Sequence, residues 1–218
     1  MRKGQKARDG QEGREGQEGV VSPFAKRDSF EDESFAGLTV AKADLSGREF
    51  VRCTFTHVVL PESDWSDTRV EDCRFEGCDL TRLRMIGTAM RGAEFVNCRL
   101  TGVDWSQLRP NPTLAFDECN LQYSSFVKMN LTGTRFTRSR LTDVNFLEAR
   151  LVETAFPGSD LTGCRFEDCD ARGADFSSAR GVAIDPARNR LTGARVALDA
   201  AVLIVEAFGL RVDGYERR

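Results

Sequence analysis

Apolar residues return at every fifth position along most of this chain. From Phe30 to Trp105 every multiple of five is apolar, and after one inserted residue the same spacing runs from Phe116 to Phe176. Both Trp lie on these positions, and so do all of the 15 Phe except two. The intervening residues are largely small, polar or charged, so the pattern indicates which side chains face a core.

This spacing excludes a continuous helix or strand. Five residues of an α-helix advance about 500°, which scatters the apolar groups around its axis. Along a strand, successive groups at an odd spacing point to opposite faces. The pattern fits short extended segments separated by corners, and such periodic sequence is typical of a solenoid, in which each coil buries its neighbours.

Sorting the apolar positions with a period of twenty separates Phe from Leu, whereas a period of fifteen mixes them. Each coil therefore has four sides of five residues, with like residues stacked about 4.8 Å apart. One side consists of Phe35, Phe55, Phe75, Phe95, Phe116, Phe136, Phe156 and Phe176. The sequence predicts an all-β solenoid of about eight to nine coils, roughly 40 Å long.

A second inward position, two residues before each central one, is usually small. It holds all seven cysteines: Cys53, Cys73, Cys78, Cys98, Cys119, Cys164 and Cys169. Because free Cys behaves as a small apolar group, we interpret them as packing groups rather than metal ligands. Disulfides between stacked coils are sterically conceivable, but the odd number favours free thiols. Larger residues at this position are expected to strain or widen their coils: Leu38, Leu83, Leu114 and Met129.

The repeats carry a recognisable motif. It stands as Ala43-Asp44-Leu45-Ser46-Gly47, Cys78-Asp79-Leu80-Thr81-Arg82 and Ser159-Asp160-Leu161-Thr162-Gly163. On these residues the chain, from about 25 to 196, resembles the pentapeptide repeat family, whose pattern is A-(D/N)-L-x-x. The resemblance implies a right-handed quadrilateral β-helix.

Composition divides the chain into three parts. Residues 1–21 are rich in Gly, Gln and charge and are predicted to be a disordered tail; a binding arm and a mis-assigned start are the alternatives. Residues 22–196 form the β-helix, with one break at 106–115, and residues 197–218 form a helix and dimerisation segment. No apolar run reaches the about 20 residues of a membrane span, and no signal-peptide core is present. We therefore expect a cytoplasmic protein without a membrane partner.

The tract 197–208, ALDAAVLIVEAF, predicts a helix with a broad apolar face, ended by Gly209. One part of this face should cover the last coil, because a solenoid end has to be capped. The other part should meet a second copy of the chain. The predicted dimer interface consists of Leu198, Ala201, Val202, Val205, Phe208 and Leu210.

Residues 184–214 resemble the end of the Qnr-type pentapeptide repeat proteins, which confer quinolone resistance. The resemblance lies in LTGARV at 191–196, the apolar helix, and FGLRV at 208–212. It implies a homodimer that mimics DNA, without binding nucleic acid directly, and that binds DNA gyrase or topoisomerase IV. Some relatives have longer protruding loops that this chain lacks. Protection of the topoisomerase from a natural poison, as in self-immunity, is therefore as consistent with the sequence as quinolone resistance.

Two surface features are candidates for contacting this partner. The break contains Leu108, Arg109, Pro110, Asn111, Pro112 and Thr113 and should bulge from the rod, although a merely tolerated insertion is the alternative. The most acidic side carries Asp44, Asp64, Asp67, Asp104, Glu148, Glu167 and Asp168. Many arginines lie among the acids, which weakens mimicry of DNA by charge.

No catalytic motif is present, and the single His57 is expected to be an ordinary surface residue. The sequence therefore predicts a non-enzymatic protein without cofactor or metal. A structural or scaffolding repeat protein, whose partner is unrelated to topoisomerases, is the alternative function.

Overall fold

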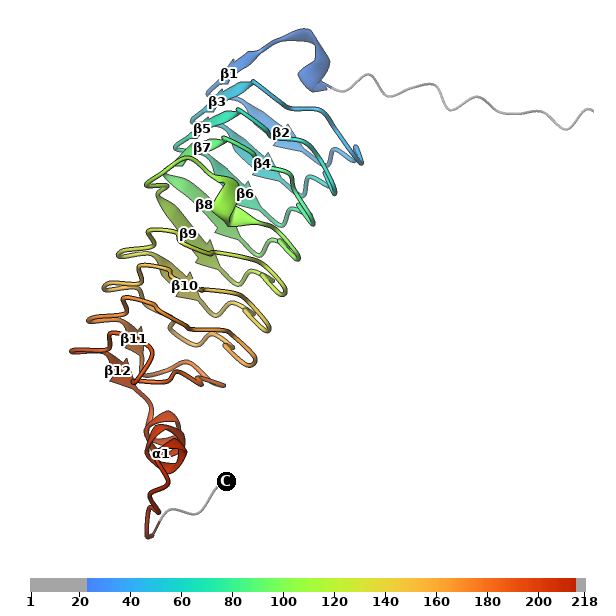
Figure 1. The fold of residues 1–218 in the computed structure, drawn as a ribbon. Coiled ribbons are helices and arrows are strands. Elements are labelled where there is room, and N and C mark those ends of the chain that lie inside the picture. The colour runs from blue at the N-terminus through green and yellow to red at the C-terminus, as the bar shows by residue number, and fades with distance from the viewer. Residues whose placement is uncertain (1–22, 215–218) are drawn as a thin grey trace, which may run out of the picture.

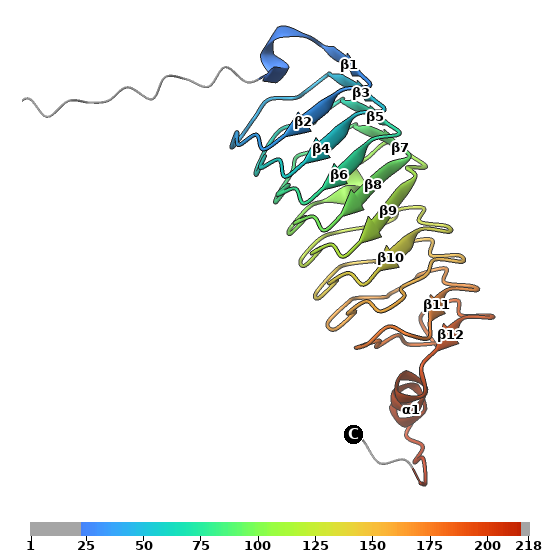
Figure 2. The same ribbon diagram turned by 180° about the vertical axis from the view of Figure 1, so that it is seen from behind.

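The computed structural model describes residues 23–214, and the chain is a β-solenoid of about eight turns followed by one α-helix. The coils stack into a rod, with the first coil at one end and the helix α1 at the other (Figures 1 and 2). The predicted fold class is confirmed. The division of the N-terminus at residue 21 lies outside the described residues.

Parallel strands on two sides of the coil form the regular sheets. One sheet has the order β1–β3–β5–β7, another β10–β9–β8–β6–β4–β2, and β11 pairs with β12. The strands are β1 (Ser29–Glu31), β2 (Ser34–Ala36), β3 (Glu49–Val51), β4 (Thr54–Thr56), β5 (Arg69–Glu71), β6 (Arg74–Glu76), β7 (Ala89–Arg91), β8 (Ala93–Val96), β9 (Leu114–Asp117), β10 (Arg135–Thr137), β11 (Asp175–Phe176) and β12 (Arg195–Val196). Isolated parallel bridges stack the other two sides and continue the first two beyond the regular strands.

The register between coils confirms the period of twenty. Phe35 pairs with Phe55, and Phe55 pairs with Phe75. At the break the interval rises to twenty-one, because Phe95 pairs with Phe116. The inserted residue is therefore absorbed within one coil, and the columns on either side stay aligned.

The core is a set of stacked columns rather than a mixed cluster. Phe136 and Phe156 are both fully buried, and their rings stack with centroids 5.2 Å apart and planes 5° apart. The small inward position is buried as well, including all seven cysteines, which are free thiols. Leu83, Leu114 and Met129 are also accommodated inside, and Leu38 is half-buried.

The corners require a left-handed backbone two residues after each central side chain. Tyr123 and Lys128 adopt φ of 60° and 59°, and Gly133 occupies the equivalent place with φ of 71°. Most corner residues still donate their N–H to the next coil, as in the 2.9 Å bond from Lys128 to the carbonyl of Leu147. These bonds offset part of the cost of a conformation that residues with a Cβ rarely adopt.

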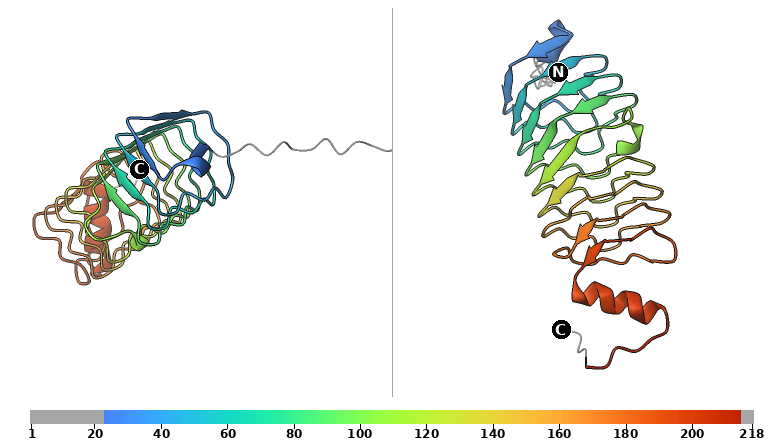
Figure 3. Two further views of the ribbon diagram at one scale, coloured as in Figure 1. Left: turned by 90° about the horizontal axis from the view of Figure 1, so that it is seen from above. Right: turned by 90° about the vertical axis from the view of Figure 1, so that its left-hand side faces the viewer.

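Each end of the described rod has a covering element. The 3-10 helix η1 (Pro23–Lys26) buries Phe24 against Phe30 and Phe35 at the first coil. At the other end, α1 (Leu198–Ala207) lies across the last coil (Figure 3). The helix predicted from 197–208 is therefore present, and Ala200 joins the core of the rod.

Candidate functional site

The break in the five-residue spacing lies against the preceding coil. The 3-10 helix η2 (Trp105–Gln107) begins it, with Asp104 accepting from the backbone N–H of Ser106. Leu108 is half-buried and packs against the core. Residues 109–113 then lead into β9, and most of them are exposed.

Arg109 is held on the rod by both its backbone and its side chain. Its N–H donates to the carbonyl of Thr88 at 2.8 Å, and its Nε donates to the carbonyl of Gly87 at 2.7 Å. Its guanidinium also lies 3.7 Å from the carboxylate of Asp67. The next backbone bond to the preceding coil comes only at Thr113, so residues 110–112 form the part of the loop that bulges.

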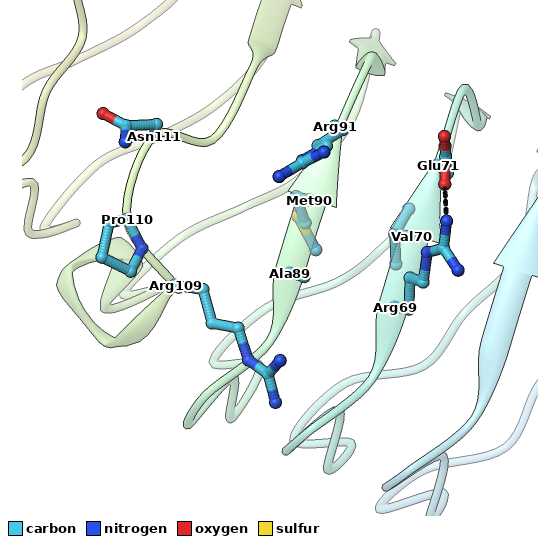
Figure 4. A pocket seen from close by; sticks show the side chains of 9 residues that line it. All are labelled: Arg69, Val70, Glu71, Ala89, Met90, Arg91, Arg109, Pro110 and Asn111. Carbon is cyan, nitrogen blue, oxygen red and sulfur yellow. Dashed lines mark hydrogen bonds and ion pairs between the residues drawn. The ribbon is translucent and has the colours of Figure 1, made fainter.

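A pocket of about 300 Å³ lies between this bulge and the neighbouring strands. We call it the break pocket; it is lined by β5, β7 and residues 109–111 (Figure 4). The side chain of Arg91 extends from β7 toward Asn111, while Arg69 turns toward Glu71 (Figure 4). Sequence reasoning selected the loop residues but missed the two arginines from the strands. Arg69 and Arg91 lie 22 residues apart, two coils and one coil before the break, and this placement is the signal that could have identified them.

The predicted acidic residues lie along one side of the rod but do not form an unbroken negative surface. Four of them have cationic partners: Asp64 lies 3.4 Å from Arg84, and Glu148 lies 3.5 Å from Lys128. Asp67 and Glu167 pair with arginines in the same way. The remaining three, Asp44, Asp104 and Asp168, form no ion pair with residues 23–214.

Charge pairing between coils is general along the rod. Within residues 23–214, twelve ion pairs join residues twenty positions apart, because that interval places two side chains directly above one another. Glu62 accepts from Arg82 at 2.9 Å and lies 3.9 Å from Lys42 on the other side. This alternation of acidic and basic residues at an interval of twenty can be read from the sequence. It accounts for the many arginines in a chain whose net charge is −3.

The cysteines and the histidine form no chemical site. Burial raises the pKa of the Cys164 thiol to about 12, so the nucleophilic thiolate is scarce at neutral pH. His57 is exposed at a corner, with its ring against Gly77. Among residues 23–214 no group of three or more His, Cys, Asp or Glu could hold a metal ion.

The residues of the predicted dimer interface divide between two environments. Val202 is only 3% exposed, while Ala201 and Val205 are half-buried. Leu198, Phe208 and Leu210 are 58–72% exposed. A shallow apolar groove of about 260 Å³ separates part of the helix, including Leu203, from residues 182–186. The single chain therefore leaves an apolar surface on the outer part of the helix.

The stacked coils, the buried central columns and the left-handed corners define a β-solenoid built from five-residue units. The model of the pentapeptide repeat region matches residues 48–110 and 112–176, and the chain belongs to the pentapeptide repeat family. Comparison with curated protein sequences gives no match. No helix within residues 23–214 has the length and apolar character needed to cross a membrane.

Several solved structures share this fold. Two trypsin-treated forms of QnrB1, a plasmid-mediated fluoroquinolone resistance protein, both align with a TM-score of 0.62. The first has 22% identity and covers 84% of this chain and 89% of its own. The second has 19% identity and covers 82% and 99%. HetL, a pentapeptide repeat protein from the cyanobacterium Nostoc, aligns with 18% identity over 79% of this chain and 89% of its own, with a TM-score of 0.39.

Proposed function

We propose that this protein binds a type II topoisomerase, DNA gyrase in particular, and protects it from a quinolone or a natural-product poison without catalysing a reaction. The observation that supports this most is the likeness of the rod to QnrB1 over 89% of that chain. QnrB1 is itself a fluoroquinolone resistance protein. The proposal implies a cytoplasmic protein.

The surface charges favour recognition by shape and local contacts over mimicry by a continuous field. Duplex DNA carries one charge per about 1.7 Å of its axis. Along the rod, many carboxylates are paired with arginine or lysine of the adjacent coil, and exposed pairs of this kind cancel much of the potential at a distance. The topoisomerase would then meet a stiff rod with separate acidic points rather than a uniformly anionic surface.

The outer apolar surface of α1 supports the further proposal of a homodimer joined end to end. Leu198, Phe208 and Leu210 are all large, apolar and more than half exposed. Leu198 begins α1, and Phe208 and Leu210 follow its end, so large apolar side chains are exposed at both ends of the helix. Apolar surface that one chain leaves uncovered can mark a protein interface. A dimer would double the length of rod available to the topoisomerase.

Gyrase supercoiling with purified components tests the function. We expect the protein to restore supercoiling in the presence of a fluoroquinolone or another gyrase poison, and a heat-denatured sample to have no effect. Absence of any effect on gyrase, with several chemically different poisons, would exclude the proposal and favour a scaffolding role.

A matched pair of variants tests the contribution of the acidic side. The triple change Asp44→Asn, Asp104→Asn and Asp168→Asn removes three charges from that side. The control change Asp28→Asn, Asp143→Asn and Glu153→Gln removes three charges that also lack an ion pair within residues 23–214 but lie on other sides. Weaker protection by the first variant alone would assign the contact to the acidic side. Equal effects would exclude it.

A further inference from the structure

One backbone N–H of β7, at the break pocket, lacks the hydrogen bond that the equivalent N–H makes in regular coils. In regular coils the N–H of the central residue donates to a carbonyl of the next coil, as Leu80 does to Arg99 at 2.8 Å. Met90 is the central residue of β7, and β7 is the last strand of its sheet. Within the described chain its N–H has no hydrogen-bond acceptor.

The route of the loop explains why this donor lacks a partner. Arg109 donates to the carbonyl of Thr88, just before β7, and Thr113 donates to the carbonyl of Met90, so the loop is bonded on both sides of the Met90 N–H. Between these two bonds the chain bulges at Pro110–Pro112, and no carbonyl of the bulge accepts from Met90. Backbone N–H groups are strong donors that proteins almost always pair, so this one is open to an acceptor from outside the described chain.

The charges around the pocket favour an anionic acceptor. Arg69, Arg91 and Arg109 line the pocket together with one acid, Glu71. Arg69 is engaged by Glu49 at 2.7 Å and by Glu71, so it is already neutralised. Arg91 forms no ion pair or side-chain hydrogen bond within residues 23–214, and its guanidinium lies on the pocket side of β7 (Figure 4).

We propose that the break pocket binds a carboxylate of an acidic segment of a protein partner. The carboxylate would accept from the Met90 N–H and pair with the guanidinium of Arg91, with Arg109 adding charge at the rim. A charge-assisted bond of this type is short and strong, and a backbone N–H beside a guanidinium suits the two oxygens of one carboxylate. The volume of about 300 Å³ admits one side chain, and it is too small for a nucleic-acid duplex.

The charge balance also favours a carboxylate over a phosphate dianion. Glu71 is part of the lining, and the carboxylate of Asp72 lies against Gly92 at the end of β7. Because Arg69 and Arg109 are already paired with carboxylates, the positive charge left to balance is that of Arg91, which one carboxylate neutralises. The proposed site does not depend on the identity of the partner, so it stands or falls separately from the topoisomerase proposal.

Selective labelling with ¹⁵N-methionine gives a direct test, because the chain has only four Met. The Met90 amide signal is assigned with Met90→Leu, and the Met129 amide, which donates to Phe126 at 3.2 Å, serves as an internal reference. Blocked tetraglutamate is titrated at constant ionic strength, with blocked tetraglutamine as the neutral control. We expect a saturable shift of the Met90 signal with tetraglutamate and no shift with tetraglutamine.

Arg91→Gln should weaken this binding about tenfold, in line with the loss of one charge-assisted contact. Arg140→Gln is the matched control, since its side chain has no ion pair or hydrogen bond within residues 23–214 and lies on another side of the rod. Its affinity should equal that of the unchanged protein.

The outcomes that overturn the proposal are equally direct. They are an unmoved Met90 signal with tetraglutamate up to about 10 mM, or equal shifts with the two peptides. Tighter binding of inorganic phosphate than of tetraglutamate would make the pocket a phosphate site. A Met90 shift with a short DNA duplex would make it a nucleic-acid site. Equal affinities of the Arg91 and Arg140 variants would remove Arg91 from the site.

Discussion

The Nε of Arg109 donates a hydrogen bond of 2.7 Å to the carbonyl oxygen of Gly87, one coil earlier along the rod. Together with the backbone bond from Arg109 to Thr88, it fastens the start of the irregular loop. The loop is therefore a shaped part of the rod surface rather than a freely moving segment. Substitution of Arg109 tests directly whether these contacts hold the loop.

Arg109→Ala should loosen this loop without unfolding the rod. The loss of one hydrogen bond with a charged donor is expected to cost about 1.5–3 kcal/mol locally, whereas the exposed pair with Asp67 adds little. Hydrogen–deuterium exchange should become faster at residues 108–113. Arg140→Ala is the control and should leave exchange in this segment unchanged; equal exchange in both variants would show that the Gly87 contact does not hold the loop.

The cysteines should be unreactive until the protein unfolds. All seven are buried, and burial raises the pKa of Cys73 to about 12 and that of Cys169 to about 11. At pH 8 a thiol reagent such as Ellman's reagent should therefore label few of them in the folded protein and all seven in guanidinium. Rapid labelling under native conditions would contradict their assignment as packing groups.

Stability should fall in acid through Asp170. The Arg172 guanidinium donates to both of its oxygens at 2.7 Å and lowers the pKa of Asp170 to about 2. Because the pKa in the folded state is below the unfolded value of about 3.9, the stabilisation is complete above that value and is lost as the pH falls toward 2. Asp170→Asn should lower the melting temperature at pH 7, and its difference from the unchanged protein should shrink between about pH 4 and pH 2. A difference that stays constant from pH 7 to pH 2 would contradict the role of Asp170.

Substitutions at two glycines with positive φ separate the cost of the backbone conformation from the cost of a steric clash. Gly133 has φ of 71° with open space where a Cβ would lie, whereas a Cβ on Gly181, at φ of 68°, would lie 2.7 Å from the backbone nitrogen of Thr162. Gly133→Ala should cost about 1 kcal/mol, the usual cost of a Cβ in this conformation. Gly181→Ala should cost about 1–3 kcal/mol more, because backbone atoms have to move. Urea denaturation measures both, and equal midpoints would refute the clash.

The proposed dimer depends on the outer surface of α1. Phe208 is 58% exposed, and Phe208→Glu should convert the dimer to a monomer in light scattering, with the circular dichroism spectrum unchanged. Val202→Glu is a different experiment, since Val202 is already buried in the single chain and the substitution should destabilise the end of the rod. A monomeric mass for the unchanged protein would exclude the dimer.

Much of the architecture follows from side-chain periodicity. The positions of Phe136 and Phe156 on one column, and of the cysteines inside, were predictable because each five-residue unit repeats the same local geometry. The candidate site was only partly predictable. The loop residues were apparent from the two prolines and the lost spacing, but the role of Arg91 depends on which coil the loop lies against.

The repeat spacing alone is enough to define a four-sided solenoid, since small and large apolar side chains at fixed intervals leave one way to fill the core. The tertiary structure decides what the spacing leaves undetermined. It decides how the inserted residue is accommodated and which backbone groups lose their hydrogen-bond partners as a result. Among residues 23–214 the Met90 N–H has no acceptor, because the loop is bonded to the carbonyls of Thr88 and Met90 and bulges between these two bonds. The exposure of Phe208 and the burial of Val202 likewise depend on how the helix docks on the last coil. The apolar pattern of the helix does not decide this, because it is compatible with either side chain facing the coil.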